Sequence, residues 1–183
     1  MTGRRSPARI ADQRTRFEDL LGYRFANSAL LRLALTHRSE AHESHSNPRG
    51  DPSVDNEQLE FVGDAVLGLI AAESLYRRFP KSSEGELTRL RASIVSREHL
   101  GKAAARLHLG EAILLGRGEE RSGGRTKPAI LANALEAVIA ALYLEGGMEV
   151  SRSFVEAHII DPAVPALRRA LGQSDAFNGA MGD

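Results

Sequence analysis

Hydrophobic residues recur at three- and four-residue steps along most of the chain, and no stretch alternates apolar and polar residues as a half-buried strand does. The pattern therefore predicts an all-α fold. Helices are expected near residues 14 to 21, after Asn27, from Asp55 or Asn56 to Arg78, after Ser82 or Ser83, from Ser96 to Leu107, from Pro128 to Gly146, and over roughly 149 to 171.

Local signals mark where several of these helices begin and end. Asn27 can accept hydrogen bonds from the first free backbone amides of the second helix. Ser83, with Glu86 three positions later, has the form of a capping box, and Phe79 with Pro80 ends the preceding helix. These boundaries follow from local chemistry and do not depend on packing.

The predicted helices form one domain, residues 16–171, between two tails. Residues 1–15 are basic and residues 172–183 are small and polar, so both tails are expected to be flexible. Residues 39–55 are rich in Ser, Pro, Gly and charge, and they are expected to form a loop. The chain has no internal repeat.

The composition is typical of a cytoplasmic globular protein. Of the 183 residues, 42% are hydrophobic, which is enough for a sizeable core. No uninterrupted apolar run reaches the length of about 18 residues that spans a bilayer, so no membrane partner is expected. The absence of cysteine excludes disulfides and thiolate-bound zinc, so any metal must bind to oxygen or histidine.

Positive charge is concentrated in two segments, although the 24 basic and 24 acidic residues cancel overall. One is the arginine-rich start, which is short for an organelle presequence. The other is the segment 115–127, which supplies Arg117, Arg121, Arg125 and Lys127. These four residues are candidate phosphate contacts, although an ordinary charged loop and a solubilising tail would have the same composition.

Three carboxylates share one stripe of the helix that begins at Asp55 or Asn56. At about 100° per residue, Glu57, Glu60 and Asp64 fall within roughly 60° of one another, so their charges repel. The neighbouring apolar residues are expected to anchor the helix in the core: Leu59, Val62, Val66, Leu69 and Ile70. Such a stripe is either a solvated helix face or, in a cleft, a set of ligands for a hard cation such as Mg²⁺.

The apolar helix after Pro128 carries two polar residues one turn apart, Asn133 and Glu136. If this face packs against Glu60 and Asp64, three carboxylates and one amide oxygen come together, which is the kind of ligand set that Mg²⁺ prefers. Sites of this kind commonly serve in-line displacement at phosphorus. Alternatively, the two polar residues bond to a neighbouring backbone group or arginine.

Histidine does not favour a different metal site. A di-iron bundle has histidine three positions after a helical glutamate, but glycine and isoleucine follow Glu60 and Glu136 at that spacing. His37, His42 and His45 lie in or near a segment rich in Pro and Gly, which offers no fixed ligand geometry.

The run NEQLEFVGDAVLG at residues 56–68 closely resembles the signature of the ribonuclease III family. Further agreement comes from LTHRS at 35–39, from EGELTRLRASIVS at 84–96, and from ILANALEAVIAALYLEGG at 130–147 after the Gly-rich loop. The resemblance covers about residues 16 to 165, and its motifs are dense and specific.

The resemblance implies the ribonuclease III endonuclease-domain fold and a metal-dependent enzyme that cuts double-stranded RNA. Its products would have 5′-phosphate and 3′-hydroxyl ends with two-nucleotide 3′ overhangs, and structured precursor RNA such as ribosomal RNA would be the substrate. By motif position, Glu60, Asp64, Asn133 and Glu136 would bind Mg²⁺, for which Mn²⁺ could substitute. Asp64 and Glu136 would be the catalytic pair.

The resemblance also implies a homodimer, in which Phe61 enters a pocket on the partner subunit; packing in its own core is the alternative. Glu57 and Glu84 match two further acidic positions and would support the metal site or position basic groups. A catalytically silent double-stranded-RNA-binding homologue is the alternative function, but it would have no need to keep all three carboxylates.

Two features depart from the family pattern. Asn133 stands where many members carry aspartate, so the site would hold three carboxylate charges instead of four, and a lower metal affinity is expected. We also expect this sequence to lack the usual C-terminal double-stranded-RNA-binding domain, since only about a dozen residues follow the last predicted helix; a naturally short form, a truncated gene and a catalytic domain expressed alone are the alternatives.

Overall fold

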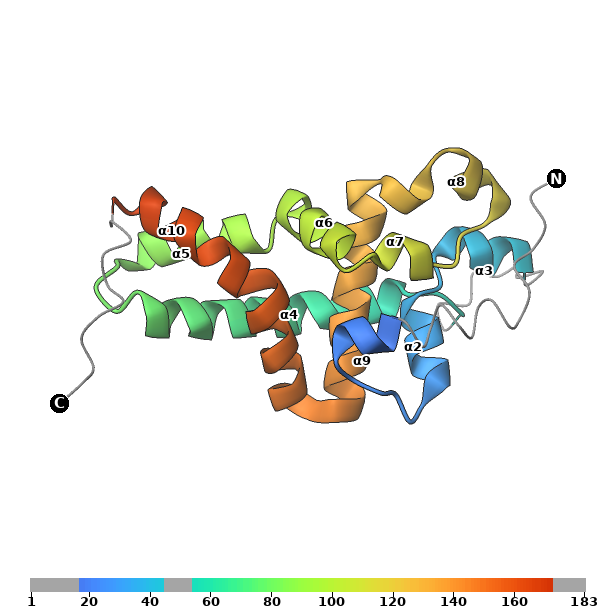
Figure 1. Ribbon diagram of the computed structural model, residues 1–183, viewed down its shortest axis with the longest axis horizontal. Coiled ribbons are helices and arrows are strands. Elements are labelled where there is room, and N and C mark those ends of the chain that lie inside the picture. The colour runs from blue at the N-terminus through green and yellow to red at the C-terminus, as the bar shows by residue number, and fades with distance from the viewer. Residues whose placement is uncertain (1–16, 45–53, 173–183) are drawn as a thin grey trace.

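Two long helices, α4 and α9, cross at the centre of the molecule, and shorter helices surround them (Figure 1). The computed structural model describes residues 17–44 and 54–172. The labelled elements are α2 (Ser28–Ala34), α3 (Arg38–Ser44), α4 (Glu57–Arg78), α5 (Glu84–Ile94), α6 (Arg97–Arg106), α7 (Leu109–Ala112), α8 (Arg117–Arg121), η2 (Gly124–Thr126), α9 (Pro128–Val155), η3 (Glu156–Ile160), η4 (Asp161–Ala163) and α10 (Val164–Ala170).

The all-α prediction is confirmed. In the two described ranges the regular structure is helical, including residues 17–21, and the one extended pairing is an isolated parallel bridge between Thr36 and Leu114. The predicted tails 1–15 and 172–183 lie outside the described residues, apart from Gly172.

Glycine allows the central helices to approach closely. Gly63 of α4 faces the backbone of Glu136 in α9, and a Cβ atom at position 63 would overlap the Glu136 carbonyl oxygen. Gly101 of α6 lies in the same way against Pro128 at the start of α9, where a Cβ atom would come within 3.1 Å. Because these glycines have no side chain, the backbones of α4, α6 and α9 pack close together.

The core lies between these three helices. Its large, fully buried side chains include Leu67, Ile70, Leu75, Leu100, Leu135, Ile139 and Leu142. A window of the continuous helical run Pro128–Ala170 has a mean hydropathy of 1.5, so by length and composition that run could cross a membrane, but 56% of the window is buried inside the protein. Packing within the chain therefore accounts for the apolar character of α9.

The helix boundaries with clear local signals are confirmed. The Asn27 side chain accepts hydrogen bonds from the backbone amides of Ala29 and Leu30. Ser83 and Glu86 form the predicted capping box at the start of α5. At the other end of the preceding loop, α4 ends at Arg78, as predicted.

The loop predicted over residues 39–55 is wrong in its first part, because α3 covers Arg38–Ser44. Tertiary contacts hold this short helix in place. Ala41 is buried, and Ser39 and Glu43 accept hydrogen bonds from the backbone amides of Gly116 and Gly118, at the start of α8. Polar residues that favour a loop locally are therefore used as contacts between segments distant in sequence.

The final helix predicted over 149–171 is confirmed in its extent, since residues 149–170 are helical throughout, but it is not one regular α-helix. Helix α9 continues to Val155, and the π-helical η3, the 3₁₀ turn η4 and α10 follow it. The backbone leaves helical geometry at Gly147, with φ 79°, one residue beyond the predicted end at Gly146. Pro162 then interrupts the helix because it has no backbone N–H to donate.

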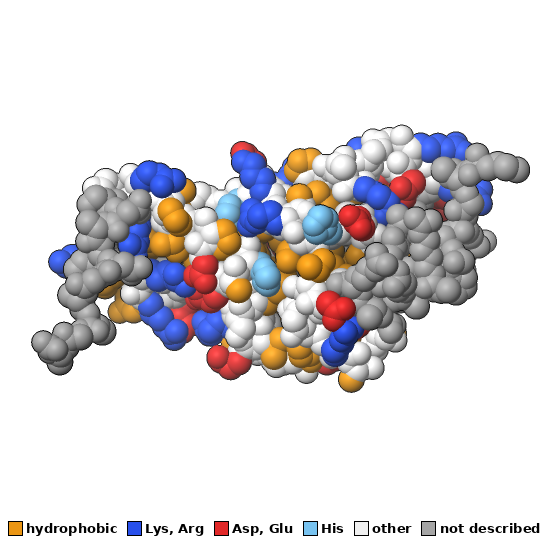
Figure 2. Space-filling view, in the orientation of Figure 1, with side chains coloured by type: hydrophobic (Ala, Val, Ile, Leu, Met, Phe, Trp, Pro, Cys, Tyr) orange, Lys and Arg blue, Asp and Glu red, His pale blue; other side chains and the backbone are white. Residues whose placement is uncertain are grey.

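Charged side chains are mixed on the surface. On the face drawn in Figure 2, the Lys and Arg side chains of the described residues are interspersed with acidic and apolar ones. The segment 115–127, predicted as a loop, contains α8 and η2. Positive charge is thus presented locally and not as one broad band on this face.

Candidate active site

A cleft of about 580 Å³ opens beside the crossing of α4 and α9. It brings together the four residues that the family motif assigned to metal binding. The cleft is lined by Glu57, Glu60, Phe61, Asp64, Val95, Arg97, Ala132, Asn133 and Glu136. The two predicted polar stripes, one on α4 and one on α9, therefore face each other across the same cleft.

The acidic stripe of α4 is oriented by the apolar residues beside it. Leu59 and Val66 are buried in the core, whereas Glu60 is half-buried and Asp64 is exposed. Because Glu60 and Asp64 are one helical turn apart, both carboxylates face the cleft. The close approach at Gly63, the residue between them in this turn, places Glu136 opposite this pair.

Glu136 is difficult to ionise in this environment. Burial raises its pKa from 4.5 to about 7, and the negative charges of Asp64 and Glu60 contribute to the rise. The positive charge of Arg97 opposes the rise without cancelling it. The protein thus gathers negative charge in the cleft that its own cations do not neutralise.

Glu60 shows the same effect to a smaller degree. Burial is the main cause of its raised pKa, and the charge of Glu57 adds to it. A hydrogen bond from the Asn133 side chain opposes the rise, as does the charge of Arg97. Asn133 therefore acts as a donor toward Glu60, and since an amide can donate and accept at once, this contact is compatible with a ligand oxygen on the same side chain.

The donor set of the cleft fits a hard divalent cation that keeps part of its water shell. Three carboxylates and an amide offer only oxygen atoms, which suit Mg²⁺ or Mn²⁺. In the part of the chain that the structure describes, no three His, Cys, Asp or Glu side chains stand close enough to hold a metal ion. Like-charge repulsion separates such carboxylates, and water molecules on Mg²⁺ bridge wider gaps than direct ligation does.

Arg97 is a cleft residue that the sequence patterns did not indicate. It is the first residue of α6, directly after the N-cap Ser96, whose side chain accepts a hydrogen bond from the His99 amide. A cation in the first turn of a helix opposes the helix dipole. That unfavourable position is the one signal in the sequence that Arg97 has a role other than stabilising its helix.

The two supporting acids lie in different places. Glu57 is at the edge of the cleft and pairs with Arg38, whose Nη1 lies 3.3 Å from its carboxylate. Glu84 does not line the cleft, and its carboxylate accepts a 2.8 Å hydrogen bond from the Thr88 hydroxyl within α5. A supporting role at the metal site stays a prediction for both residues, with direct proximity only for Glu57.

Arg125 is held by contacts within the basic segment. Its guanidinium donates to both carboxylate oxygens of Glu120, at 2.7 and 2.6 Å. It also donates to the carbonyl oxygens of Gly110 and Ile113. All three guanidinium nitrogens therefore have hydrogen-bond partners in the chain. These bonds connect the basic segment to α7 and to the residue that follows it.

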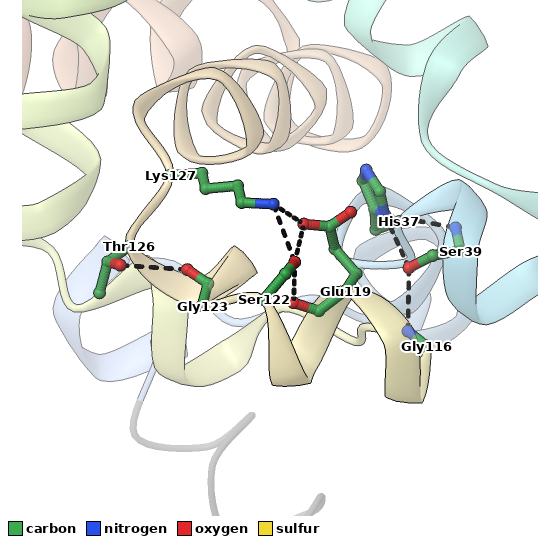
Figure 3. A network of polar contacts seen from close by, with 8 residues as sticks. All are labelled: His37, Ser39, Gly116, Glu119, Ser122, Gly123, Thr126 and Lys127. Carbon is green, nitrogen blue, oxygen red and sulfur yellow. Dashed lines mark hydrogen bonds and ion pairs between the residues drawn. The ribbon is translucent and has the colours of Figure 1, made fainter.

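Lys127 is also engaged, whereas the arginines of α8 are exposed. The Lys127 ammonium donates to the carboxylate of Glu119 and the hydroxyl of Ser122 (Figure 3). Arg117 and Arg121 are solvent-exposed on α8. Of the four predicted phosphate contacts, Arg117 and Arg121 are therefore best placed to bind a phosphate, because doing so would not break the ion pairs that Arg125 and Lys127 form within the segment.

His37 belongs to the same network and does not form a histidine metal site. Its Nδ1 accepts a hydrogen bond from the Ser39 amide at 3.2 Å, and the Ser39 hydroxyl accepts from the Gly116 amide at 2.9 Å (Figure 3). Burial lowers the pKa of His37, which favours the neutral ring. His42 lies on the exposed side of α3, and His45 is outside the described residues.

Comparison with known proteins accounts for this arrangement. A model of the family described as ribonuclease-III-like matches residues 27–163. The chain belongs to the ribonuclease III family. Its relatives include Ribonuclease 3 of Solibacter usitatus, 54% identical over 142 residues, and Ribonuclease 3 of Desulforamulus reducens, 51% identical over 144 residues.

The match to these ribonucleases covers a large part of this chain but a smaller part of theirs. The region aligned with the Solibacter protein is 77% of this chain and 52% of that protein. The region aligned with the Desulforamulus protein is 79% of this chain and 57% of that protein. This ribonuclease III chain thus spans about half the length of the curated relatives it matches.

Solved structures locate the match in the nuclease domain of ribonuclease III. The nuclease domain from Campylobacter jejuni is 41% identical, with a TM-score of 0.72 over 82% of this chain and 97% of that one. Its description concerns structural flexibility in a region involved in dimer formation. Dicer from Giardia is 25% identical, with a TM-score of 0.60 over 86% of this chain and 20% of that one.

This ribonuclease III chain exposes an apolar stripe on α4, formed by Phe61, Leu69 and Tyr76. Their exposed fractions are 79%, 55% and 71%, and at about 100° per residue they lie within roughly 80° of one another. The prediction that Leu69 anchors α4 in the core is wrong, and so is the alternative that Phe61 packs within its own chain. Three large apolar side chains on one helix face mark an interaction surface beside the cleft.

Glu136→Gln is expected to change how the stability of this ribonuclease III domain depends on pH when no metal is bound. Because the folded-state pKa is about 7 and the ordinary value is 4.5, the proton on Glu136 stabilises the fold below pH 4.5, and this stabilisation is lost as the pH rises to 7. After allowance for partial solvent exposure, the loss is about 1 kcal/mol.

Thermal unfolding in chelator at pH 5 and pH 8 measures this difference. Glu136→Gln should unfold at a temperature about 3 °C above the wild type at pH 8, and the gap should shrink at pH 5. An equal gap at both values would mean that ionisation of Glu136 is not the cause.

Proposed function

We propose that this chain is the nuclease domain of a ribonuclease III that cuts double-stranded RNA with the aid of a divalent metal. The observation that carries the proposal is the cleft itself, where Glu60 and Asp64 of α4 meet Glu136 of α9. Burial in this cleft, together with the charges of Asp64 and Glu60, raises the pKa of Glu136 to about 7. Membership of the family and the likeness to the Campylobacter nuclease domain support the same activity.

In this proposal Glu60, Asp64 and Glu136 hold the metal, and Asn133 offers a fourth oxygen while its amide donates to Glu60. Mg²⁺ or Mn²⁺ bound there would supply a Lewis acid and a water that is easier to deprotonate. Asp64 and Glu136 are the catalytic pair, because they lie on opposite helices and face the same space. The cleavage leaves a 5′-phosphate and a 3′-hydroxyl, with no covalent enzyme intermediate.

The enzyme acts as a homodimer in which the α4 stripe of Phe61, Leu69 and Tyr76 meets its copy. Phe61 lines the cleft as well as the stripe, so the subunit contact borders the metal site. Two such sites acting on one duplex account for the two-nucleotide 3′ overhang. The description of the Campylobacter nuclease domain refers to a region involved in dimer formation, which supports a dimer for this chain as well.

Double-stranded RNA is held chiefly through its phosphates. Arg117 and Arg121 are the exposed residues on α8 that would contact phosphates. Arg125 and Lys127 hold the segment together through ion pairs with Glu120 and Glu119, and they add positive charge to it. Recognition then follows the A-form shape more than the base sequence. Structured precursor RNA such as ribosomal RNA is the expected substrate, in the cytoplasm, where the absence of cysteine is no disadvantage and no membrane partner is needed.

The decisive experiment incubates the protein with a long RNA duplex in Mg²⁺, in Ca²⁺ and in chelator. Cleavage in Mg²⁺ alone, with 5′-phosphate ends and short overhangs, is the expected result. Binding of the duplex without cleavage under any condition would favour the catalytically silent RNA-binding homologue. Neither binding nor cleavage would reject both functions.

Asn133→Asp is expected to lower the Mg²⁺ concentration that gives half-maximal cleavage. The change adds a fourth negative charge to the cleft, and added ligand charge strengthens the binding of hard cations. The measurement is a Mg²⁺ titration of initial cleavage rates at pH 8. An unchanged or higher requirement would show that the hydrogen bond from Asn133 to Glu60 matters more than the missing charge.

A further inference from the structure

Arg97 is the cationic side chain among the residues that line the carboxylate cleft. It is exposed, and its charge lowers the pKa values of Glu60 and Glu136 through space. Within the described residues, however, its guanidinium makes no ion pair or hydrogen bond. Five N–H donors thus remain available at the edge of a strongly acidic site.

Other arginines in this fold form ion pairs with the acidic side chains near them. Arg78 lies 2.6 Å from a carboxylate oxygen of Asp161, and Arg152 lies 2.7 Å from one of Glu73. The cleft that Arg97 lines contains four carboxylates, and within the described residues Arg97 forms an ion pair with none of them. Its position is therefore not that of a counter-ion that ties two helices together.

Helix stability does not explain Arg97 either. Helix α6 is already capped by Ser96, and its first turn contains Glu98, which suits the positive end of the helix dipole. A positive side chain at the first helical position is mildly unfavourable there. Among the described residues, Arg97 therefore has no partner that accounts for its place.

An RNA strand that enters the cleft would supply an anion for Arg97. A phosphate that enters a cleft lined by four carboxylates meets repulsion, and a metal bound to Glu60, Asp64 and Glu136 would offset their charge. Once they are neutralised, Arg97 has no local anion, and the phosphate is the anion nearest to it. The planar fork of a guanidinium binds two phosphate oxygens at once, which fixes the orientation of the phosphate as well as its distance.

We propose that Arg97 binds a phosphate of the RNA strand in the cleft and thereby positions that strand against Glu60, Asp64 and Glu136. This inference rests on the proposed nuclease function. Arg97 is a substrate-positioning residue contributed by a third helix, α6, in addition to the two that supply the carboxylates.

Binding of a short fluorescent RNA duplex tests the assignment, with Ca²⁺ in place of Mg²⁺ and salt varied between about 50 and 200 mM. Arg97→Ala should weaken binding about tenfold, as expected for the loss of a charged hydrogen bond. It should also reduce the slope of log affinity against log salt by about one for each Arg97 engaged. Arg97→Lys should restore the slope but not the full affinity, since an ammonium lacks the fork.

Arg169→Ala is the matched control, because Arg169 is an exposed arginine on α10 that does not line the cleft. It should leave affinity and slope unchanged. Thermal unfolding of each variant shows whether the fold is intact, and calorimetric titration with Mn²⁺ alone measures metal affinity without any RNA.

Two results would overturn the assignment. The first is that Arg97→Ala binds the duplex with wild-type affinity and slope. The second is that it binds Mn²⁺ more tightly with RNA binding unchanged, which would make Arg97 a counter-ion for the carboxylates. Failure of the wild type to bind or cut the duplex would instead reject the proposed function, so the two failures are distinguishable.

Discussion

Glu136→Gln is expected to reduce cleavage of an RNA duplex at least about 100-fold while the domain stays folded. The substitution keeps the shape of the side chain and removes one of the three charges that would hold the metal. Metal ions in such sites stabilise the transition state by several kcal/mol, and each 1.4 kcal/mol is a factor of ten in rate. Initial rates with a saturating duplex across a range of Mg²⁺ concentrations measure the loss.

The control for this variant is Glu149→Gln, which changes an exposed glutamate of α9 that does not line the cleft. It should cleave at the wild-type rate. Because Glu136→Gln also relieves charge repulsion, its metal-free thermal stability should equal or exceed that of the wild type at pH 8. A stable Glu136→Gln protein with near-normal turnover would overturn the assignment of the site.

Phe61→Ala is expected to weaken the proposed homodimer by a factor of about 30 or more. An aromatic anchor at the centre of an interface contributes about 2 kcal/mol or more, which corresponds to that factor in the dissociation constant. The side chain is 79% exposed in the single chain, so its removal takes little from the stability of the subunit itself. Sedimentation velocity over a range of protein concentrations measures the dimer constant.

Leu144→Ala is the matched control, because Leu144 is another large exposed apolar residue, 55% exposed, and lies outside the α4 stripe. It should leave the dimer constant unchanged. Cleavage by Phe61→Ala should fall steeply on dilution, since the two cuts of one duplex need two subunits. A wild type that stays monomeric at high concentration, or a Phe61→Ala dimer as tight as the wild type, would contradict the α4 interface.

The candidate site was largely predictable because its residues occupy helices with strong periodicity. Glu60 and Asp64 share a stripe at a spacing of four, and Asn133 and Glu136 share one at a spacing of three. Helical geometry alone then places each pair on one face. The structure adds that both faces line the same cleft.

The position of Arg97 in the cleft could not be predicted from sequence patterns. This residue follows a helix cap in an otherwise ordinary amphipathic segment, and its position in the cleft depends on how α6 packs against α9. The basic segment shows the same limit, because composition treats Arg117 and Arg125 alike. Only the fold shows that Arg125 is bound to Glu120 while Arg117 is exposed.

Residues 39–44 were mispredicted for a related reason. The residues of α3 have weak helical signals, and the helix is held by contacts with the segment before α8. Near the C-terminal end, the helical extent over 149–170 was predicted, but the π-helical η3 and the 3₁₀ turn η4 within it were not. In both places the local preference is weak, so longer-range packing decides the outcome.

The sequence by itself determined the helical class, the main helix caps, and the two polar stripes, because each depends on residues within a few positions of one another. Only the tertiary structure decided that the stripes meet, through the close approach of Gly63 to Glu136. It also decided that burial and like charge raise the pKa of Glu136, and that Phe61 and Leu69 face outward. These properties depend on distances between segments far apart in the chain, which periodicity cannot encode.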